Sequence, residues 1–380
     1  MSLNFIFRMG TKIIFRKNAI RELGVEVDTL GGKRVMIVTD KTLVEKTDIV
    51  EKAKKSLGSR LCVIFDEVIP DSSCEIVNKG YSVAKDNSID CIVSIGGGSS
   101  IDTAKAILIL MNKGGKIEEH SGAFILSSPT LPHIAVPTTA GTGSEVSHVS
   151  VIKDLSKKRK LLFVDWYIMP SSAILDPLLT VNMPPSITAY TGVDALAHCI
   201  EAIHSLQNNP ISDAFAIHGI RLIKDNLPKV LEKPDDVISR GNMLIAASMG
   251  GAAFTNAQVG VVHAVAHSIG ARYGIPHGLA NSLILPHGMR FNLDSCPRYS
   301  LVANAFGVSD ENPEKGIEAV ENFIKKLGIP TSLKEVGIPE SDFEKIAEDS
   351  IQDGSIISNP KFAADVSLLK EILKNAYIGI

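Results

Sequence analysis

Two apolar stretches carry histidines and a carboxylate at helical spacing. GVVHAVAHSIG places His263 and His267 four positions apart, and GVDALAHCIE does the same for Asp194 and His198. Residues at this spacing lie on one face of a helix, one turn apart. Such side chains can be core residues hydrogen-bonded to backbone, or they can bind a divalent metal. Two pairs in one chain favour the metal site.

A glycine-rich turn is the second feature with chemical potential. GGGSSIDTAK, residues 96–105, directly follows the apolar segment 90–95. Glycines let the backbone approach a ligand closely, and free N–H groups at a helix start can hold a pyrophosphate. The turn does not follow the GxGxxG pattern, and a purely structural role is the alternative.

Asp40 ends an earlier apolar segment, residues 34–39. A carboxylate at this place can accept hydrogen bonds from ribose hydroxyls and repel a 2′-phosphate, which favours NAD over NADP. The alternative is an aspartate that ends a strand at a turn.

The pattern of elements predicts two domains that position these groups. In residues 1–183 short apolar strands alternate with helices, which predicts an α/β dinucleotide-binding domain with a Rossmann-like parallel sheet. After Met183-Pro184-Pro185, residues 184–380 predict an all-helical domain that holds the metal. The predicted helices are 186–205, 210–226, 236–251, 257–271, 312–327, 340–348 and 365–377.

The composition argues against several classes of binding partner. The 380 residues carry a formal charge of −3, which argues against nucleic acid or an anionic membrane as a partner. There is no run of about 18 apolar residues, so no transmembrane helix is expected. The first residues, MSLNFIFRMG, lack the pattern of a signal peptide. Five scattered cysteines without CxxC predict a reduced, cytoplasmic protein.

GVDALAHCIE followed by GVVHAVAHSIGARYGIPHG resembles the paired signatures of the iron-containing (group III) alcohol dehydrogenases. The resemblance implies a dehydroquinate synthase-like fold and four metal ligands. It also implies that His267 faces the substrate, where it is our candidate proton relay. Iron is favoured by the resemblance, with zinc as the alternative. The implied ligands are Asp194, His198, His263 and His277.

The same resemblance extends to the nucleotide site. GGGSSID resembles the family's pyrophosphate-holding motif, PTTAGTGSEV is nearly verbatim, and KLLFVDWYIMPSSAILDP fits its lysine-to-Asp-Pro stretch. One departure is Asp71, in Pro-Asp-Ser, where many relatives have Pro-Asn-Pro; this leaves substrate choice open. The implied cofactor contacts are Gly97, Gly98, Ser99, Asp102, Thr138, Thr139, Ser147, Lys160 and Leu179.

These features predict hydride transfer between NAD and a primary alcohol or diol, or the matching aldehyde or ketone, with the metal polarising the substrate oxygen. A glycerol or hydroxy-acid dehydrogenase on the same scaffold is the near alternative. A dehydroquinate synthase-like lyase would need basic groups for a substrate phosphate, and the metal motifs offer only Arg272 and Arg290. A nucleotide-binding protein without catalysis is the third alternative. At family level a homodimer is expected, paired through an N-terminal edge strand.

Overall fold

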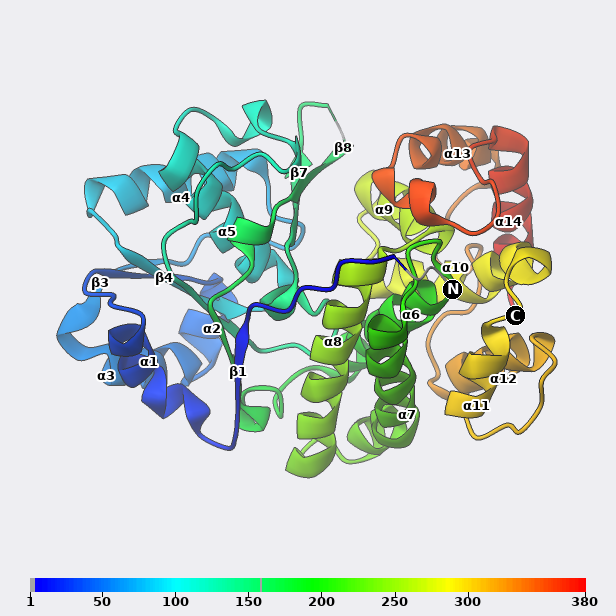
Figure 1. Ribbon diagram of the computed structural model, residues 1–380, viewed down its shortest axis with the longest axis horizontal. Coiled ribbons are helices and arrows are strands. Elements are labelled where there is room, and N and C mark those ends of the chain that lie inside the picture. The colour runs from blue at the N-terminus through cyan, green and yellow to red at the C-terminus, as the bar shows by residue number, and fades with distance from the viewer. Residues whose placement is uncertain (1–3, 158) are drawn as a thin grey trace. The chain divides into compact units, whose positions relative to one another are not determined.

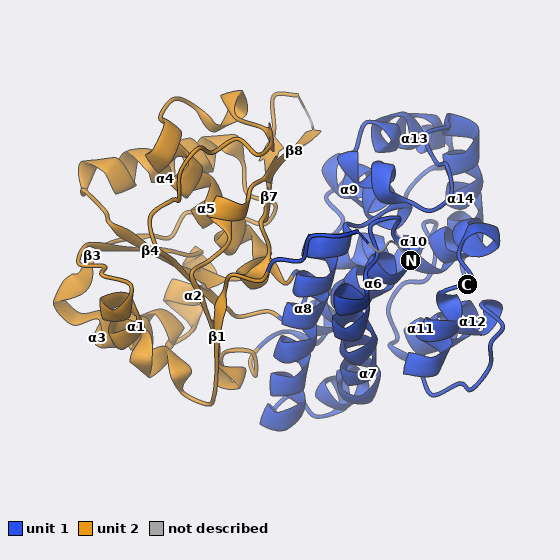
Figure 2. Ribbon diagram, viewed as in Figure 1, with its two compact units in different colours: residues 1–8, 140–142, 183–380 blue, residues 9–139, 143–182 orange. Residues whose placement is uncertain are grey.

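The computed structural model describes residues 4–157 and 159–380 (Figure 1). The chain divides into two compact units (Figure 2). Unit 2 comprises residues 9–139 and 143–182, and unit 1 comprises residues 183–380 with the short segments 4–8 and 140–142.

Unit 2 is built on a six-stranded sheet in which every neighbouring pair of strands is parallel. The strand order is β1-β9-β6-β4-β2-β3. Because all strands run the same way, their carboxyl ends lie along one edge, where loops in such folds bind ligands. This confirms the predicted parallel sheet. The strands are β1 (Lys12–Phe15), β2 (Val35–Val38), β3 (Leu61–Phe65), β4 (Cys91–Gly96), β6 (His133–Pro137) and β9 (Ser172–Leu175).

Helices cover both faces of this sheet (Figure 1). Val35 and Ile37 of β2 pack into one core with α1 (Leu23–Thr29) and α3 (Ile49–Leu57). Met36 and Val38 point the other way, into a second core with α4 (Cys74–Asp86) and α5 (Gly98–Lys113). A strand buried on both faces must be apolar at every position, which explains the continuous apolar runs of the sequence.

A second, small sheet was not predicted. It has the order β5-β8-β7, and β7 pairs antiparallel with β8. Near the N-terminus β1 forms an edge strand of the larger sheet, and it pairs in parallel with β9. The strands of the small sheet are β5 (Gly122–Ala123), β7 (Val149–Asp154) and β8 (Arg159–Val164).

Unit 1 is helical: among its described residues there are α-helices and 3-10 turns but no strand. Two helices, α10 and α11, were not predicted. Pro276 and Pro286 read as helix breakers, yet Pro276 is the N-cap of α10 and Pro286 is accommodated inside it. The helices are α6 (Pro185–His204), α7 (Pro210–Glu232), α8 (Val237–Ala257), α9 (Val261–Tyr273), α10 (His277–Asn292), α11 (Tyr299–Ala305), α12 (Glu314–Lys326), α13 (Phe343–Ile351) and α14 (Val366–Ile378).

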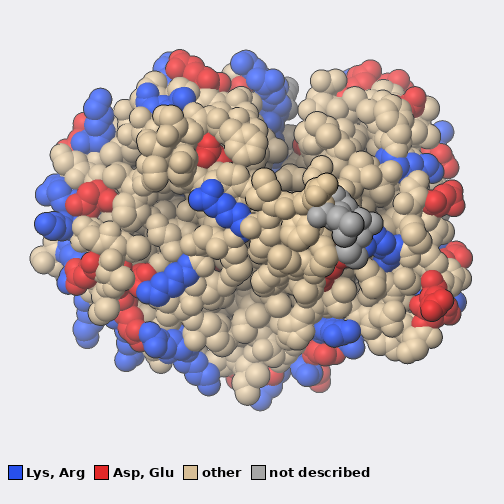
Figure 3. All heavy atoms as spheres, viewed as in Figure 1, with Lys and Arg blue, Asp and Glu red and all other residues tan. Residues whose placement is uncertain are grey.

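Basic and acidic side chains are interspersed over the face shown in Figure 3. All five cysteines are free thiols. In the described part of the chain, none of the helices combines the length and apolarity that crossing a bilayer requires.

Candidate metal and nucleotide sites

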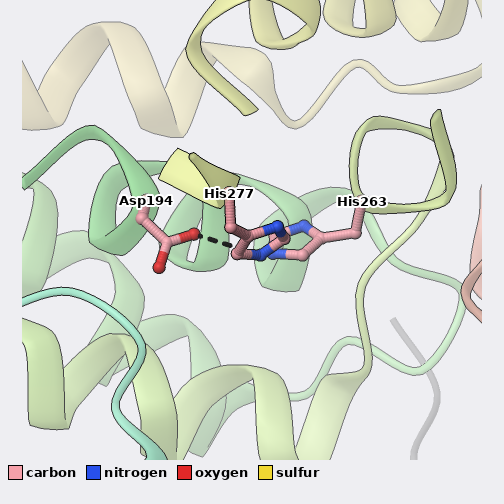
Figure 4. Close-up of side chains that lie close together, drawn as sticks. All are labelled: Asp194, His263 and His277. Atoms are coloured by element: carbon pink, nitrogen blue, oxygen red, sulfur yellow. Dashed lines mark ion pairs between the residues drawn. The ribbon is translucent and has the colours of Figure 1, made fainter. Parts of the chain in front are cut away.

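Three side chains from three different helices converge in unit 1. The ligand atoms of Asp194, His263 and His277 all lie within 4.8 Å of one another, and Figure 4 shows the side chains pointing toward each other. The closest ion pair, Nε2 of His277 to Oδ1 of Asp194, spans 3.5 Å. One carboxylate and two imidazoles form a donor set that suits Fe²⁺ or Zn²⁺.

His198, the fourth implied ligand, lies beside this group but not within it. Its ring centroid is 4.6 Å from that of His263, and its other neighbour is the ring of Phe254 at 4.4 Å. Burial lowers the pKa of His198 to about 4, so its imidazole is neutral. A buried, neutral imidazole whose ring lies next to that of His263 is a donor that suits the same cation, so His198 fits the metal as well.

Gly278 allows His277 to converge with Asp194. His277 is the first residue of α10, and Asp194 lies in the middle of α6. A Cβ at Gly278 would collide with the backbone carbonyl of Tyr190 in α6 and lie 3.2 Å from Cβ of Asp194. Only glycine therefore lets α10 approach α6 closely enough to bring His277 to Asp194.

Glu201 contacts the candidate site and was not singled out from the sequence. Its carboxylate is fully buried and hydrogen-bonds to Nδ1 of His263. It also accepts hydrogen bonds from the backbone N–H groups of Gly260 at 2.9 Å and Val262 at 3.1 Å, at the start of α9. Its signal was present, because Asp194, His198 and Glu201 follow the i, i+4, i+7 pattern of one helix face.

Glu201 and His263 each shift the pKa of the other so that its charged form is favoured. Burial raises the pKa of Glu201, but the cationic forms of His263 and His204 outweigh burial and hold it well below its usual range. Burial likewise opposes the cationic form of His263, yet Glu201 raises the pKa of His263 overall. With Nδ1–H bonded to Glu201, Nε2 of His263 is the nitrogen that would bind a cation once its own proton is lost.

Asn281, one turn beyond His277 on α10, was also missed. Its amide nitrogen lies 2.7 Å from Oδ1 of Asp194, and 3.2 Å from Nε2 of both His263 and His277. The amide therefore faces all three converging side chains and orients the Asp194 carboxylate.

His267 lies next to the cluster with a partner of its own. Its ring stacks on His277 with 5.1 Å between centroids, and Nδ1 lies 2.8 Å from Oδ2 of Asp353. Burial opposes ionisation of Asp353, but the charge of His267 and hydrogen bonds from His267 and Ser355 lower its pKa to about 2. A carboxylate on one nitrogen leaves Nε2 of His267 to exchange a proton.

In unit 2 the glycine-rich turn lies at the carboxyl edge of the parallel sheet. Gly96 ends β4 with φ 149°, and Gly97 is the N-cap of α5. Thr138 donates its backbone N–H to the Gly96 carbonyl at 2.9 Å. A Cβ at Gly97 would lie 3.2 Å from Oγ1 of Thr139. The structure thus brings Gly97, Gly98, Thr138 and Thr139 together at the first turn of α5.

Two implied cofactor contacts, Asp102 and Ser147, are occupied by internal hydrogen bonds. Asp102 accepts from Oγ of Ser144 at 2.5 Å and from the backbone N–H of Val151 at 3.0 Å. Ser147 is buried, and its Oγ accepts from Nζ of Lys105 at 3.0 Å. Both residues therefore hold the segment 144–151 against α5.

Lys105 ties this network together and was not singled out from the sequence. Its side chain is fully buried and donates also to Oγ of Ser144 at 2.8 Å and to the Val149 carbonyl at 2.7 Å. Burial lowers the pKa of Lys105 to about 8, against the opposing charges of Asp102 and Glu145.

The remaining implied cofactor contacts are Asp40, Leu179 and Lys160, and each lies in a different environment. Asp40 is the N-cap of α2 (Lys41–Lys46), and its carboxylate accepts from the backbone N–H of Leu43 at 3.1 Å. Leu179 is buried in the core on the α1/α3 face of the sheet. Lys160 forms an ion pair with Asp71, with 3.1 Å between Nζ and Oδ1.

Comparison with known proteins agrees with this geometry. The family described as iron-containing alcohol dehydrogenase matches residues 10–177, and its C-terminal counterpart, the Fe-containing alcohol dehydrogenase family, matches residues 188–377. The NAD-dependent methanol dehydrogenase of Bacillus methanolicus is 37% identical over 372 residues, covering 96% of this chain and 97% of that protein. The 1,3-propanediol dehydrogenase of Klebsiella pneumoniae is 39% identical, covering 91% and 92%. A crystal structure of 1,3-propanediol oxidoreductase superposes with a TM-score of 0.94 at 36% identity, covering 98% of this chain and all of that one. The chain belongs to the iron-containing alcohol dehydrogenase family.

Proposed function

We propose that this protein is an NAD-dependent, metal-dependent dehydrogenase of primary alcohols or diols, with Fe²⁺ favoured over Zn²⁺. The observation that carries the proposal is the convergence of Asp194, His263 and His277. Similarity to a methanol dehydrogenase and a 1,3-propanediol dehydrogenase supports the substrate class. A divalent cation held there would act as a Lewis acid toward the alcohol oxygen, while NAD accepts the hydride.

The chain's own residues then have separate tasks. Asp194, His198, His263 and His277 would hold the cation. Glu201 and Asn281 orient His263 and Asp194. An alcohol must lose its hydroxyl proton as hydride leaves, and we assign its removal to Nε2 of His267, with Asp353 fixing the ring through Nδ1.

For the dinucleotide, the first turn of α5 would hold the pyrophosphate through Gly97, Gly98 and Ser99, flanked by Thr138 and Thr139. Asp40, at the end of β2, would accept from the ribose hydroxyls and repel a 2′-phosphate, which favours NAD over NADP. The internal bonds of Asp102 and Ser147 support a shaping role beside this turn. Leu179, on the nicotinamide side, and Lys160, as a further cofactor contact, stay in the proposed set.

Three further features belong to the proposal. Domains over residues 1–183 and 184–380 are supported by the two compact units. A homodimer is supported by β1, an edge strand with exposed Ile13 and Phe15. A cytoplasmic location is supported by five free thiols.

The two arginines near the metal motifs do not favour the lyase alternative, because each already pairs with a carboxylate. Arg272 pairs with Asp349 at 2.6 Å, and Arg290 pairs with Glu321 at 2.8 Å. Both cations are compensated, so neither offers an uncompensated charge to a substrate phosphate. Glycerol or a hydroxy acid as substrate stays a near alternative on the same scaffold.

The test follows NADH absorbance on protein loaded anaerobically with Fe²⁺ or Zn²⁺. Primary alcohols, diols, glycerol and hydroxy acids are offered with NAD, then with NADP, with and without chelator. We expect chelator-sensitive NADH formation with primary alcohols or diols. His263→Ala should lose both metal and turnover, while His218→Ala, an exposed histidine on α7, should keep both. Full activity of the His263 variant without bound metal would refute the site.

A further inference from the structure

Asp71 and Lys160 form an ion pair whose cation is largely buried. The Lys160 side chain is only 7% exposed and the Asp71 side chain 33%, and Nζ lies 3.1 Å from Oδ1. The two residues are far apart in sequence, so tertiary structure alone joins them. An ammonium group this buried has little water to screen it and depends on its carboxylate partner.

The pair lies at the beginning of α5. The backbone N–H of Asp71 donates to Oγ of Ser99 at 3.1 Å, and Ser99 is the second residue of that helix. Burial raises the pKa of Asp102, in the second turn of α5, and the charge of Lys160 is close enough to oppose that rise. An ionic pair thus sits where the helix start would hold the pyrophosphate.

The backbone holds Asp71 in this position at a conformational cost. Its φ is +52°, in the left-handed region that most side chains avoid. Asparagine accepts this region at least as readily as aspartate, so Asp71→Asn removes the charge without changing shape or backbone preference.

We infer that Asp71 weakens dinucleotide binding by neutralising Lys160 beside the start of α5, and so keeps the cofactor exchangeable. This inference rests on the nucleotide site proposed above. The buried cation would otherwise attract the pyrophosphate, and the Asp71 carboxylate would otherwise repel it. With both present the pair is neutral, and the helix start alone supplies the attraction. Release of bound cofactor limits turnover in many enzymes, so a weaker hold favours turnover.

The expected size follows from Coulomb's law. One unit charge acting on a phosphate about 7–10 Å away, at an effective dielectric of about 20 and with salt screening, changes affinity by about 5- to 50-fold. Removing the Asp71 charge should therefore tighten binding within that range, and the gain should shrink as salt rises.

The experiment titrates the full chain with NADH and with ADP-ribose, following NADH fluorescence and calorimetry. We expect Asp71→Asn to bind both ligands about 5- to 50-fold more tightly and to release NADH more slowly in stopped flow. Asp28→Asn is the matched control, because Asp28 forms an ion pair with Arg60 at 2.5 Å. Arg60 directly precedes β3, at the amino edge of the sheet, opposite the edge where α5 begins. This control should leave both affinities unchanged.

A double-mutant cycle tests whether Asp71 and Lys160 act on the dinucleotide as opposing charges. Lys160→Met should weaken NADH binding about as much as Asp71→Asn tightens it, and the double variant should bind NADH as wild type does. Unchanged or weaker NADH binding in Asp71→Asn, or unchanged binding in Lys160→Met, would overturn the inference. The wild-type titration separates the two proposals: if wild type binds neither NADH nor ADP-ribose, the nucleotide site itself fails and this inference falls with it.

Discussion

The carboxylate of Glu201 is hydrogen-bonded to Nδ1 of His263. It also accepts hydrogen bonds from the backbone N–H groups of Gly260 and Val262, at the start of α9. One buried side chain of α6 therefore fixes both where α9 starts and how the ring of His263 is oriented. The N-terminus of α9 stabilises the negative charge, and the charge fixes the proton on Nδ1.

Glu201→Gln should weaken metal affinity about 10- to 100-fold, because an outer-shell partner sets ligand orientation and basicity. The amide cannot accept from two backbone N–H groups and the ring as a carboxylate does. A competition titration against a metal chelator measures the affinity. Glu371→Gln, an exposed glutamate of α14, is the control. Unaltered metal affinity in the Glu201 variant would remove it from the site.

Gly278→Ala should separate α10 from α6, because its Cβ would collide with the Tyr190 carbonyl. The expected loss of unfolding free energy is about 1–3 kcal/mol, together with weakened metal binding, since His277 moves with the helix start. Urea unfolding and metal analysis measure the two effects. Gly354→Ala, where a Cβ meets no atom within 4 Å, should leave both unchanged. A Gly278 variant with wild-type metal affinity would show that the close approach is dispensable.

His267→Ala should keep bound metal but lower kcat, by about 10²- to 10⁴-fold if the ring moves the proton of the alcohol. Its pH–rate profile should lose the limb that the imidazole contributes. Metal content and kcat against pH are measured together. An unchanged profile would exclude His267 from proton transfer and leave it a packing residue.

Asp353→Asn should make the free energy of unfolding depend less on pH in the acid range. The folded pKa of Asp353 is lowered to about 2, below the usual unfolded value of about 3.9. The carboxylate therefore contributes stability above about pH 4, which is lost as pH falls toward 2. The contribution is about 2–3 kcal/mol by linkage. Unfolding free energies of wild type and variant should differ at pH 6 and converge near pH 2. Parallel curves across this range would contradict the pairing with His267.

Lys105→Met should change stability in the alkaline range. The folded pKa of Lys105 is lowered to about 8, below the unfolded value of about 10.4. Between these values the unfolded chain binds more protons, so this lysine makes stability rise with pH. The rise is about 3 kcal/mol by linkage, and it should be missing in the variant. Denaturant unfolding of both proteins from pH 7.5 to 10.5 measures the difference. A constant difference between the two would contradict the lowered pKa.

The sequence by itself determined the local features. The apolar strands of unit 2 were predictable because strands buried on both faces must be apolar throughout. The glycine-rich turn was predictable because it directly follows β4 and opens α5. Asp194 and His198 share a helix face for the same local reason, namely the 3.6-residue period.

Only the tertiary structure decided which faces meet. His263 and Glu201 are 62 residues apart, and Asn281 and Asp194 are 87 apart. Helical periodicity gives the face of each residue, but neither the register of one helix against another nor which helices pack together. The close approach of α10 to α6, the role of Asp353 behind His267 and the pairing of Asp71 with Lys160 all depend on such contacts. For that reason the candidate metal-binding motifs could be recognised in the sequence, while the residues that contact and orient their side chains became visible only in the folded chain.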